Sequence, residues 1–270
     1  MDYGLLVLAI ALAASAGAGG RALARRRGRA WVAGYAAPLV LALLFAGVRW
    51  VPALEFNAVV RLFIAGRTEF LLMAAGAPLL FGCTIPKLRP RLRPAVTAFA
   101  VVAATYFVLP FLLPVCLRAR HRGLATEIDA DGVCRQSTGY TCGPAAAVTA
   151  LHRLDIDADE GDLAVALHTT PVHGTQAETI CRVLRRRYRT HGLTAAYRRF
   201  DHVAELPDDT PCIVVVEHSF LVDHFVTLLG REGDEVVLAD PLRGLTREFR
   251  DGFSRAWRGS AILLQRRGHD

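Results

Sequence analysis

The sequence lacks the short motifs that identify several common classes of protein. Its six cysteines form no CxxC pair, which leaves a zinc ribbon or a thioredoxin-like redox site without support. No P-loop motif is present, so this chain carries no P-loop ATPase. The net charge of +7 comes without a DNA- or RNA-binding signature, and we expect no nucleic acid partner. No internal repeat or low-complexity tract occurs.

Charge is missing from four apolar stretches in the first 117 residues. Each approaches the roughly 20 residues that a helix needs to span a bilayer, and hydrophobic residues make up 53% of the chain. Burial inside a soluble core is the alternative, and it would require a far larger protein. We predict a membrane domain over 1–117 with about four transmembrane helices, at 3–20, 30–48, 70–86 and 94–117. Because none contains a charged residue, the domain resembles an anchor more than a transporter.

Basic residues flank these stretches and predict their orientation. The chain begins with MDYG and places its first arginines after the apolar run, the reverse of a signal peptide, so we expect the run to be retained. Loops one and three carry the larger share of basic residues, which favours the cytoplasm for them. With four spans the remaining domain lies outside the cytoplasm. If 70–86, which contains glycine and proline, is not a span, that domain lies in the cytoplasm. The basic residues of the two loops are Arg21, Arg25, Arg26, Arg27, Arg29, Lys87, Arg89, Arg91 and Arg93.

From about Arg118 the composition becomes that of an ordinary globular domain, which we assign to 118–270. It opens with CRQSTGYTCGPAAAVTALHRL, in which Pro144 and the alanines after it favour the start of a helix. Cys142 is therefore expected at a helix N-terminus, where free backbone N–H groups and the helix dipole stabilise a thiolate. Cys142 is a candidate nucleophile, and a buried structural cysteine is the alternative.

A thiolate nucleophile needs a base and a group that orients the base. His224 begins one predicted strand and Asp240 follows the next, and a short turn makes the two strands an antiparallel hairpin. The start of the first strand then lies near the end of the second, so His224 and Asp240 can touch. The predicted strands are Cys212–Glu217, His224–Leu229 and Glu235–Ala239.

Three further side chains bear on this arrangement. Asp223 adjoins His224, but neighbours on a strand point to opposite faces of the sheet. His218 is expected in a turn, without a matching acid at a strand end. Gln136 precedes Cys142 in the loop that leads to the helix, where its amide could donate a hydrogen bond to an oxyanion beside the backbone N–H of Cys142.

Between these motifs the sequence predicts two helices that act as scaffold. The first covers 159–168 and has acids in its first turn. The second covers 175–190, with Thr175 and Glu178 as a capping box and Gly192 at its end. The second helix carries arginines on a face interpreted as solvated, with contact to anionic lipid as the alternative. These arginines are Arg182, Arg185, Arg186, Arg187 and Arg189.

The run QSTGYTCGPA, together with HTTPVHGTQAETICRVLRRR, VDHFV and LADP, resembles the bacteriocin-processing peptidases, the double-glycine leader peptidases of the papain clan. The resemblance implies that Cys142 is the nucleophile and His224 the base. It further implies that Asp240 orients His224 and that Gln136 serves the oxyanion. The implied fold is an α+β papain-like domain in which the cysteine-bearing helix packs on a small antiparallel sheet. In the best-known members the peptidase precedes an ATP-driven exporter in the cytoplasm, whereas here it follows the apolar stretches.

The resulting hypothesis is a membrane-anchored cysteine peptidase that cleaves a peptide or protein, with a leader or secreted peptide as the candidate substrate. A separate exporter and the lipid bilayer are the expected partners, and the chemistry requires no metal or cofactor. One alternative is another acyl transfer on the same triad, such as deamidation or cross-linking. A second is a non-proteolytic domain that binds a peptide and assists an exporter. A transporter with an accessory domain is a third.

Overall fold

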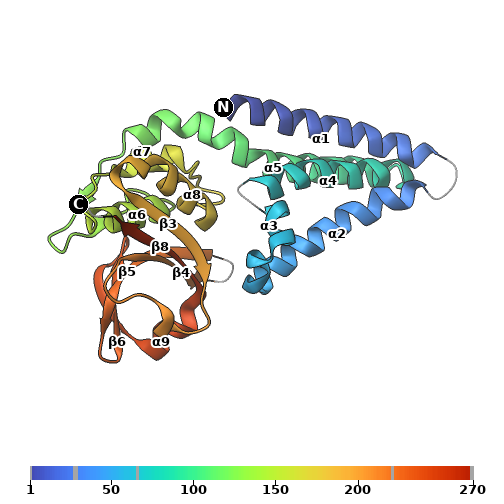
Figure 1. Cartoon of the computed structure of the whole chain (residues 1–270). Helices are drawn as coiled ribbons and strands as arrows, with labels where there is room; N and C mark the ends of the chain where they lie inside the picture. Colours follow the sequence, from blue (N-terminus) through green and yellow to red (C-terminus); the bar gives the residue numbers. More distant parts are fainter. Residues whose placement is uncertain (1, 27–29, 65–66, 220–221, 268–270) are drawn as a thin grey trace. The chain divides into compact units, whose positions relative to one another are not determined.

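The computed structural model describes residues 2–26, 30–64, 67–219 and 222–267 of the chain (Figure 1). Arg27 and Arg29, two of the basic residues predicted for the first loop, lie outside these ranges. The chain divides into two compact units that meet between Cys116 and Leu117. Each unit has hydrophobic side chains packed in its own interior.

The first unit is helical. Four of the described helices are long and apolar enough to cross a membrane by length and composition, and their crossing stays a prediction. The segment between the second and third of them forms short helices. In chain order the elements are α1 (Asp2–Arg25), α2 (Ala30–Trp50), η1 (Pro52–Phe56), α3 (Ala58–Ile64), α4 (Thr68–Thr84), η2 (Ile85–Lys87) and α5 (Arg93–Arg122), which ends in the second unit.

Glycines let α1 and α4 approach closely. A Cβ on Gly20 would lie 2.5 Å from the carbonyl oxygen of Leu79, and one on Gly82 would lie 2.5 Å from that of Gly17. No side chain fits in either place. Such small-residue contacts are typical of helices that pack inside a bilayer, where van der Waals contact replaces the hydrophobic effect between helices.

The second unit is built on a six-stranded antiparallel sheet with the order β3-β8-β4-β5-β6-β7. The three strands predicted from sequence are confirmed as β4, β5 and β6, and each extends by one or more residues beyond its predicted bounds. The strands are β3 (Leu193–Arg199), β4 (Cys212–Ser219), β5 (Val222–Glu232), β6 (Glu235–Asp240), β7 (Gly244–Phe249) and β8 (Trp257–Arg266). A separate pair is formed by β1 (Glu127–Ile128) and β2 (Cys134–Arg135).

Helices cover both faces of the sheet. In β4, Ile213 and Val215 face one core, and Cys212 and Val214 face the other, as the alternation of side chains along a strand requires. The first core includes residues of α6, α7 and α8, and the second includes Phe253 of α9 (Figure 1). The helices are α6 (Cys142–His152), α7 (Glu160–Ala166), α8 (Ala177–Arg187) and α9 (Arg250–Ala256), with short 3-10 turns η3 (Arg189–His191) and η4 (Val203–Glu205).

The predicted capping box of the second scaffold helix is wrong. The N-cap of α8 is Gln176, which makes no side-chain cap bond. The hydroxyl of Thr175 instead forms a hydrogen bond of 2.8 Å with the hydroxyl of Thr169. That bond lies outside the four-residue pattern from which the capping box was predicted. Helix α8 is shorter than predicted, and Gly192, in the left-handed region at φ 74°, ends η3 rather than the helix. The arginines of this region are exposed, as predicted.

Candidate active site

Cys142 is the first residue of α6, so the prediction that it begins a helix is confirmed. Thr141 is the N-cap residue, and the Oγ1 of Thr141 accepts a hydrogen bond of 3.1 Å from the backbone N–H of Thr138. Every residue from Gly143 to Leu151 is buried, which fixes the helix against the sheet. Cys142 itself is half-buried. Its thiol therefore stands at the N-terminal end of a rigid helix, where backbone N–H groups favour negative charge.

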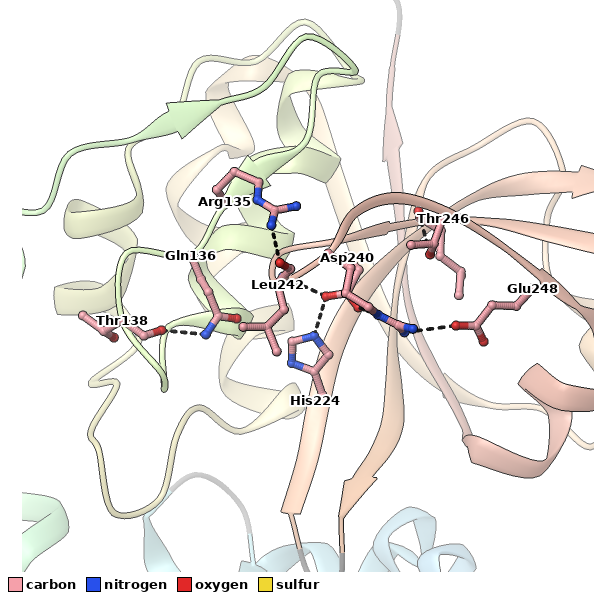
Figure 2. Close-up of polar contacts among 10 residues, drawn as sticks. Arg135, Gln136, Thr138, His224, Asp240, Leu242, Thr246 and Glu248 are labelled. Carbon is pink, nitrogen blue, oxygen red and sulfur yellow. Dashed lines mark hydrogen bonds and ion pairs between the residues drawn. The ribbon is translucent and has the colours of Figure 1, made fainter.

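The sheet brings His224 and Asp240 together (Figure 2). His224 lies near the start of β5, and Asp240 is the last residue of β6, which pairs with β5 in antiparallel register. The Nε2 atom of His224 lies 2.8 Å from Oδ1 of Asp240. Both side chains are almost fully buried, with exposed fractions of 7% and 2%. The contact expected from the hairpin is present.

Asp240 is held as a carboxylate by further donors. Its Oδ1 accepts a hydrogen bond of 2.8 Å from the backbone N–H of Leu242, and its Oδ2 accepts one of 2.7 Å from Nε of Arg243. Burial alone would raise the pKa of Asp240, but the bonds from His224, Arg243 and Leu242 outweigh burial and hold that pKa well below its usual range. The carboxylate can therefore only accept, so Nε2 of His224 carries the proton between them.

Arg243 is a residue of this cluster that the sequence analysis did not identify. Besides Asp240 it contacts Glu248 on β7, to which its guanidinium donates a hydrogen bond of 3.0 Å. Its position in the sequence could have indicated this contact. Arg243 comes three residues after the aspartate that ends β6, and the turn at Pro241 can bring its side chain back to that carboxylate.

Cys142 lies near enough to His224 to take part, together with Asp240, in raising the pKa of the ring. Since Nε2 faces Asp240, Nδ1 is the ring nitrogen left for the thiol. Burial lowers the pKa of His224, but the hydrogen bond with Asp240 and the interaction with Cys142 raise it to about 9. The ring is therefore an imidazolium at neutral pH, and an imidazolium beside a cysteine stabilises its thiolate.

Gln136 lies on the loop that passes the end of β6. Its backbone N–H donates a hydrogen bond of 3.1 Å to the carbonyl oxygen of Pro241, the residue after Asp240. Its side-chain Nε2 donates one of 2.6 Å to the carbonyl oxygen of Thr138, and its Oε1 is buried without a hydrogen-bond partner among the described residues. An amide nitrogen has two hydrogens, so one donor of Gln136 remains for a ligand. Figure 2 shows Gln136, His224 and Asp240 around the turn that follows β6.

The structure also shows where Asp223 and His218 lie, the residues weighed as alternatives to Asp240 and His224. Asp223 accepts a hydrogen bond of 2.9 Å from Nε of Arg258, away from Asp240, in agreement with its expected orientation. His218 does not lie in a turn as predicted. It belongs to β4, at the irregularity between Glu217 and Ser219 where that strand bulges against β5. Its ring centroid lies 5.6 Å from that of His224, so His218 borders the site without being the residue that Asp240 orients.

The other thiols of the second unit are poorly suited to attack. Cys134, Cys181 and Cys212 are buried. Burial, followed by the nearby carboxylate of Glu160, raises the pKa of Cys134 to about 12, and burial raises that of Cys212 to about 12. Cys142 is the one half-buried cysteine among the described residues of this unit.

Comparison with known proteins identifies the family. The model of the peptidase C39 family matches residues 131–269. The chain belongs to the peptidase C39 family. The second unit is therefore a cysteine peptidase domain, a hydrolase, and the predicted α+β papain-like fold is confirmed. The predicted resemblance to double-glycine leader peptidases over the C-terminal half is confirmed as well.

Relatives of this C39 chain each match about half of the sequence. An uncharacterized protein of Methanothermobacter marburgensis is 29% identical over 134 residues, which are 50% of this chain and 88% of that protein. One of Methanothermobacter thermautotrophicus is 25% identical over 145 residues, 53% of this chain and 94% of that protein.

Solved structures similar to the C39 domain include two peptidases of transporters. The peptidase domain of Streptococcus ComA, a bi-functional ABC transporter of a quorum sensing pathway, is 22% identical with a TM-score of 0.43, and the match covers 49% of this chain and 96% of that domain. A double glycine motif protease from an AMS/PCAT transporter, in complex with the leader peptide, is 21% identical with a TM-score of 0.43, and the match covers 53% of this chain and 94% of that protease.

Proposed function

We propose that the protein is a membrane-anchored cysteine endopeptidase in which Cys142, His224 and Asp240 form the catalytic triad. The observation that carries the proposal is the 2.8 Å contact between Nε2 of His224 and Oδ1 of Asp240, in a ring whose pKa Cys142 also helps to raise. A nucleophile, a base and an orienting carboxylate in this order are the parts that acyl transfer requires.

The first half of the reaction forms a thioester. The Cys142 thiolate attacks the carbonyl carbon of the peptide, and the carbonyl π electrons move to oxygen. The backbone N–H of Cys142 and the remaining Nε2 hydrogen of Gln136 bind that oxyanion. The oxyanion then collapses as the C–N bond breaks, and the imidazolium of His224 gives its Nδ1 proton to the departing amine. The amine product leaves, and His224 is neutral.

The second half releases the acid product. Neutral His224 takes a proton from water through Nδ1, and the hydroxide equivalent attacks the thioester carbon. The same donors hold the second oxyanion. The C–S bond then breaks with its electrons on sulfur, which restores the thiolate beside the imidazolium. Throughout, Asp240 keeps Nε2 protonated and the ring in one orientation, and Arg243 and the N–H of Leu242 keep Asp240 in place.

The proposed substrate is a leader or secreted peptide that a separate exporter handles. Membership of the C39 family and the resemblance of the motifs around Cys142 to those of double-glycine leader peptidases support it. The helices α1, α2, α4 and α5 are the proposed anchor, supported by their length and apolar composition. The balance of basic residues between the loops supports a peptidase outside the cytoplasm.

Trapping the acyl-enzyme tests this function against the other reactions open to the same triad. The full-length protein is mixed with a peptide that contains a Gly-Gly site, quenched in acid and digested for mass spectrometry. We expect the N-terminal half of the peptide on Cys142 as a thioester, and free acid as the final product. A product joined to an amine would indicate cross-linking, and loss of ammonia from an intact peptide would indicate deamidation. Peptide affinity without any adduct would indicate a binding domain.

A further inference from the structure

The carboxyl end of α5 is packed into the second unit beside the loop that leads to Cys142. His121 is 1% exposed, and its Nε2 lies 3.4 Å from the hydroxyl oxygen of Tyr140, with the two ring centroids 5.9 Å apart. Tyr140 belongs to the loop 137–141, which separates Gln136 from Cys142. His121 precedes the part of the chain that the family model matches, which begins at residue 131.

The same helix end lies directly on the backbone of α7. A Cβ on Gly161 would lie 2.1 Å from the carbonyl oxygen of His121. That oxygen also accepts a hydrogen bond of 3.0 Å from the N–H of Leu124, at the end of α5. Glycine at position 161 is therefore required for this approach, and any side chain there would push the end of α5 away.

The residues that follow α5 in the chain make further contacts with α7 and with the loop before Cys142. The hydroxyl of Thr126 donates to Oδ2 of Asp159 at 2.8 Å and accepts from the N–H of Glu160 at 2.8 Å. The carbonyl oxygen of Ala125 lies 2.9 Å from Oγ of Ser137. Ser137 directly follows Gln136, so this segment contacts the loop at its beginning, as His121 does near its end.

Glu160 fixes Ser137 from the other side. Its side chain is fully buried, with an exposed fraction of 0%. Its Oε1 accepts a hydrogen bond of 3.0 Å from the N–H of Ser137, and its Oε2 lies 2.6 Å from Oγ of Ser137. Among the described residues, none of the ion pairs of this unit involves Glu160. A buried carboxyl group needs hydrogen bonds to offset its lost hydration, so the contact with Ser137 is strongly favoured.

From these contacts we infer that residues 121–126 and Glu160 form a positioning element for the oxyanion side of the peptidase site. They touch no substrate. They hold loop 137–141 at both ends, and that loop sets where the amide of Gln136 stands relative to Cys142. The inference rests on the proposed function. It adds that the last candidate span does more than anchor the peptidase, because the end of α5 is part of what makes the site competent.

Two glycine variants of the full-length protein test the inference. Gly161→Ala places a methyl group against the carbonyl oxygen of His121, whereas Gly252→Ala places one where nothing lies within 4 Å. Both glycines are inside helices, in α7 and α9. The probe is a fluorogenic peptide with a Gly-Gly site, and kcat and KM are measured separately. A second readout is the rate at which iodoacetamide alkylates Cys142, a reaction that forms no oxyanion.

We expect Gly161→Ala to lower kcat by on the order of 10²-fold, the usual effect of a misplaced catalytic group. KM and the alkylation rate should stay close to the wild-type values, and Gly252→Ala should match the wild type throughout. If Gly161→Ala fails to fold, Ser137→Ala replaces it, because it removes the hydroxyl that faces Glu160 and Ala125 and adds no bulk. Ser137→Ala should likewise lower kcat and leave KM and the alkylation rate unchanged.

Unchanged kcat in both test variants would overturn the inference, as would equal losses of kcat and of alkylation. The proposed function fails in a different way. If the wild-type protein alkylates at Cys142 but cleaves no peptide, the function is wrong, whatever the variants do.

Discussion

At the scale of single residues, the proposed chemistry depends on which groups carry protons. The low pKa of Asp240 and the raised pKa of His224 have a common origin in their buried contact. Arg243 and the N–H of Leu242 also donate hydrogen bonds to Asp240, and these bonds lower its pKa further. The result is a ring that is charged at neutral pH and held in one orientation. This is the state in which His224 can both support a thiolate and protonate a leaving amine.

The first prediction concerns pH. Because the folded-state pKa of His224 is about 9, above its ordinary value of 6.5, its charge adds stability that is complete below about pH 6.5 and is lost as pH rises through about 9. The alkaline limb of kcat/KM should fall in the same region, near pH 9. Asp240→Asn should move that limb to lower pH, since the hydrogen bond that His224 donates to Asp240 raises the pKa of His224. Asp223→Asn is the control, and an equal displacement there would contradict the assignment.

The second prediction concerns Gln136. If its amide serves the oxyanion, Gln136→Ala should lower kcat by about 10²–10³-fold. KM should change little, because the interaction forms in the transition state rather than in the ground state. Steady-state kinetics on the Gly-Gly peptide measure both quantities. A change confined to KM would mean that Gln136 binds the substrate instead.

At the scale of secondary structure, the site consists of the start of one helix and the ends of two strands. The hydroxyl of Thr227 in β5 donates a hydrogen bond of 2.8 Å to the carbonyl oxygen of Ala146 in α6, and Thr227 is fully buried. This bond joins the element that carries His224 to the one that carries Cys142. It fixes their separation more firmly than apolar packing alone would.

The third prediction follows from that bond. Thr227→Val keeps the shape of the side chain but removes the donor, which should lower the free energy of unfolding by about 1 kcal/mol. Thr246→Val is the matched control, because Thr246 is only partly buried and its bond to the carbonyl oxygen of Leu238 measures 3.5 Å. Thermal unfolding of the detergent-solubilised protein compares the two. Equal losses of stability would show that the bond between α6 and β5 contributes no more to the free energy of unfolding than the bond of Thr246 does.

How much the sequence could predict also differs from element to element. The run CIVVV in β4 is apolar without interruption because both faces of the sheet are covered, so its strand was evident. The edge strand β7, GLTREF, has a half-exposed polar pattern that no periodicity rule separates from a loop. Strand β8 contains Gly259 in the left-handed region, at φ 70°, and was missed as well.

The positions of the candidate site residues could be predicted from the sequence better than the elements of the scaffold. Cys142, His224 and Asp240 stand at the ends of elements with strong local signals, which is why their positions followed from sequence. The role of Arg243 required the turn geometry after Asp240, and the bulge that brings His218 beside His224 required the register of β4 on β5. The contact between His121 and Tyr140 joins segments whose proximity no local pattern encodes.

At the scale of the whole molecule, two units of different composition share one chain. The first holds the four candidate spans, and the second holds the peptidase fold. Helix α5 belongs to both, since it begins at Arg93 and ends at Arg122. A peptidase that continues directly from an apolar helix stays close to any membrane that the helix enters.

The fourth prediction concerns topology. Four spans with basic first and third loops place the C-terminus outside the cytoplasm. Alkaline phosphatase fused after residue 270 should therefore be active, and green fluorescent protein fused there should be dark. Fusions after residue 58, between the second and third candidate spans, give a reference on the same side. The reverse result at residue 270 would place the peptidase in the cytoplasm and imply three spans.

Cys142 is the proposed nucleophile of the peptidase, and replacing its thiol tests that role. Full-length Cys142→Ala is compared with Cys212→Ala, which alters a buried thiol on the far core. Cleavage of the Gly-Gly peptide is followed by mass spectrometry at equal protein concentration. We expect no cleavage above background for Cys142→Ala, with an unchanged circular dichroism spectrum, and persistent cleavage for Cys212→Ala. Cleavage at the wild-type rate by folded Cys142→Ala would contradict that role.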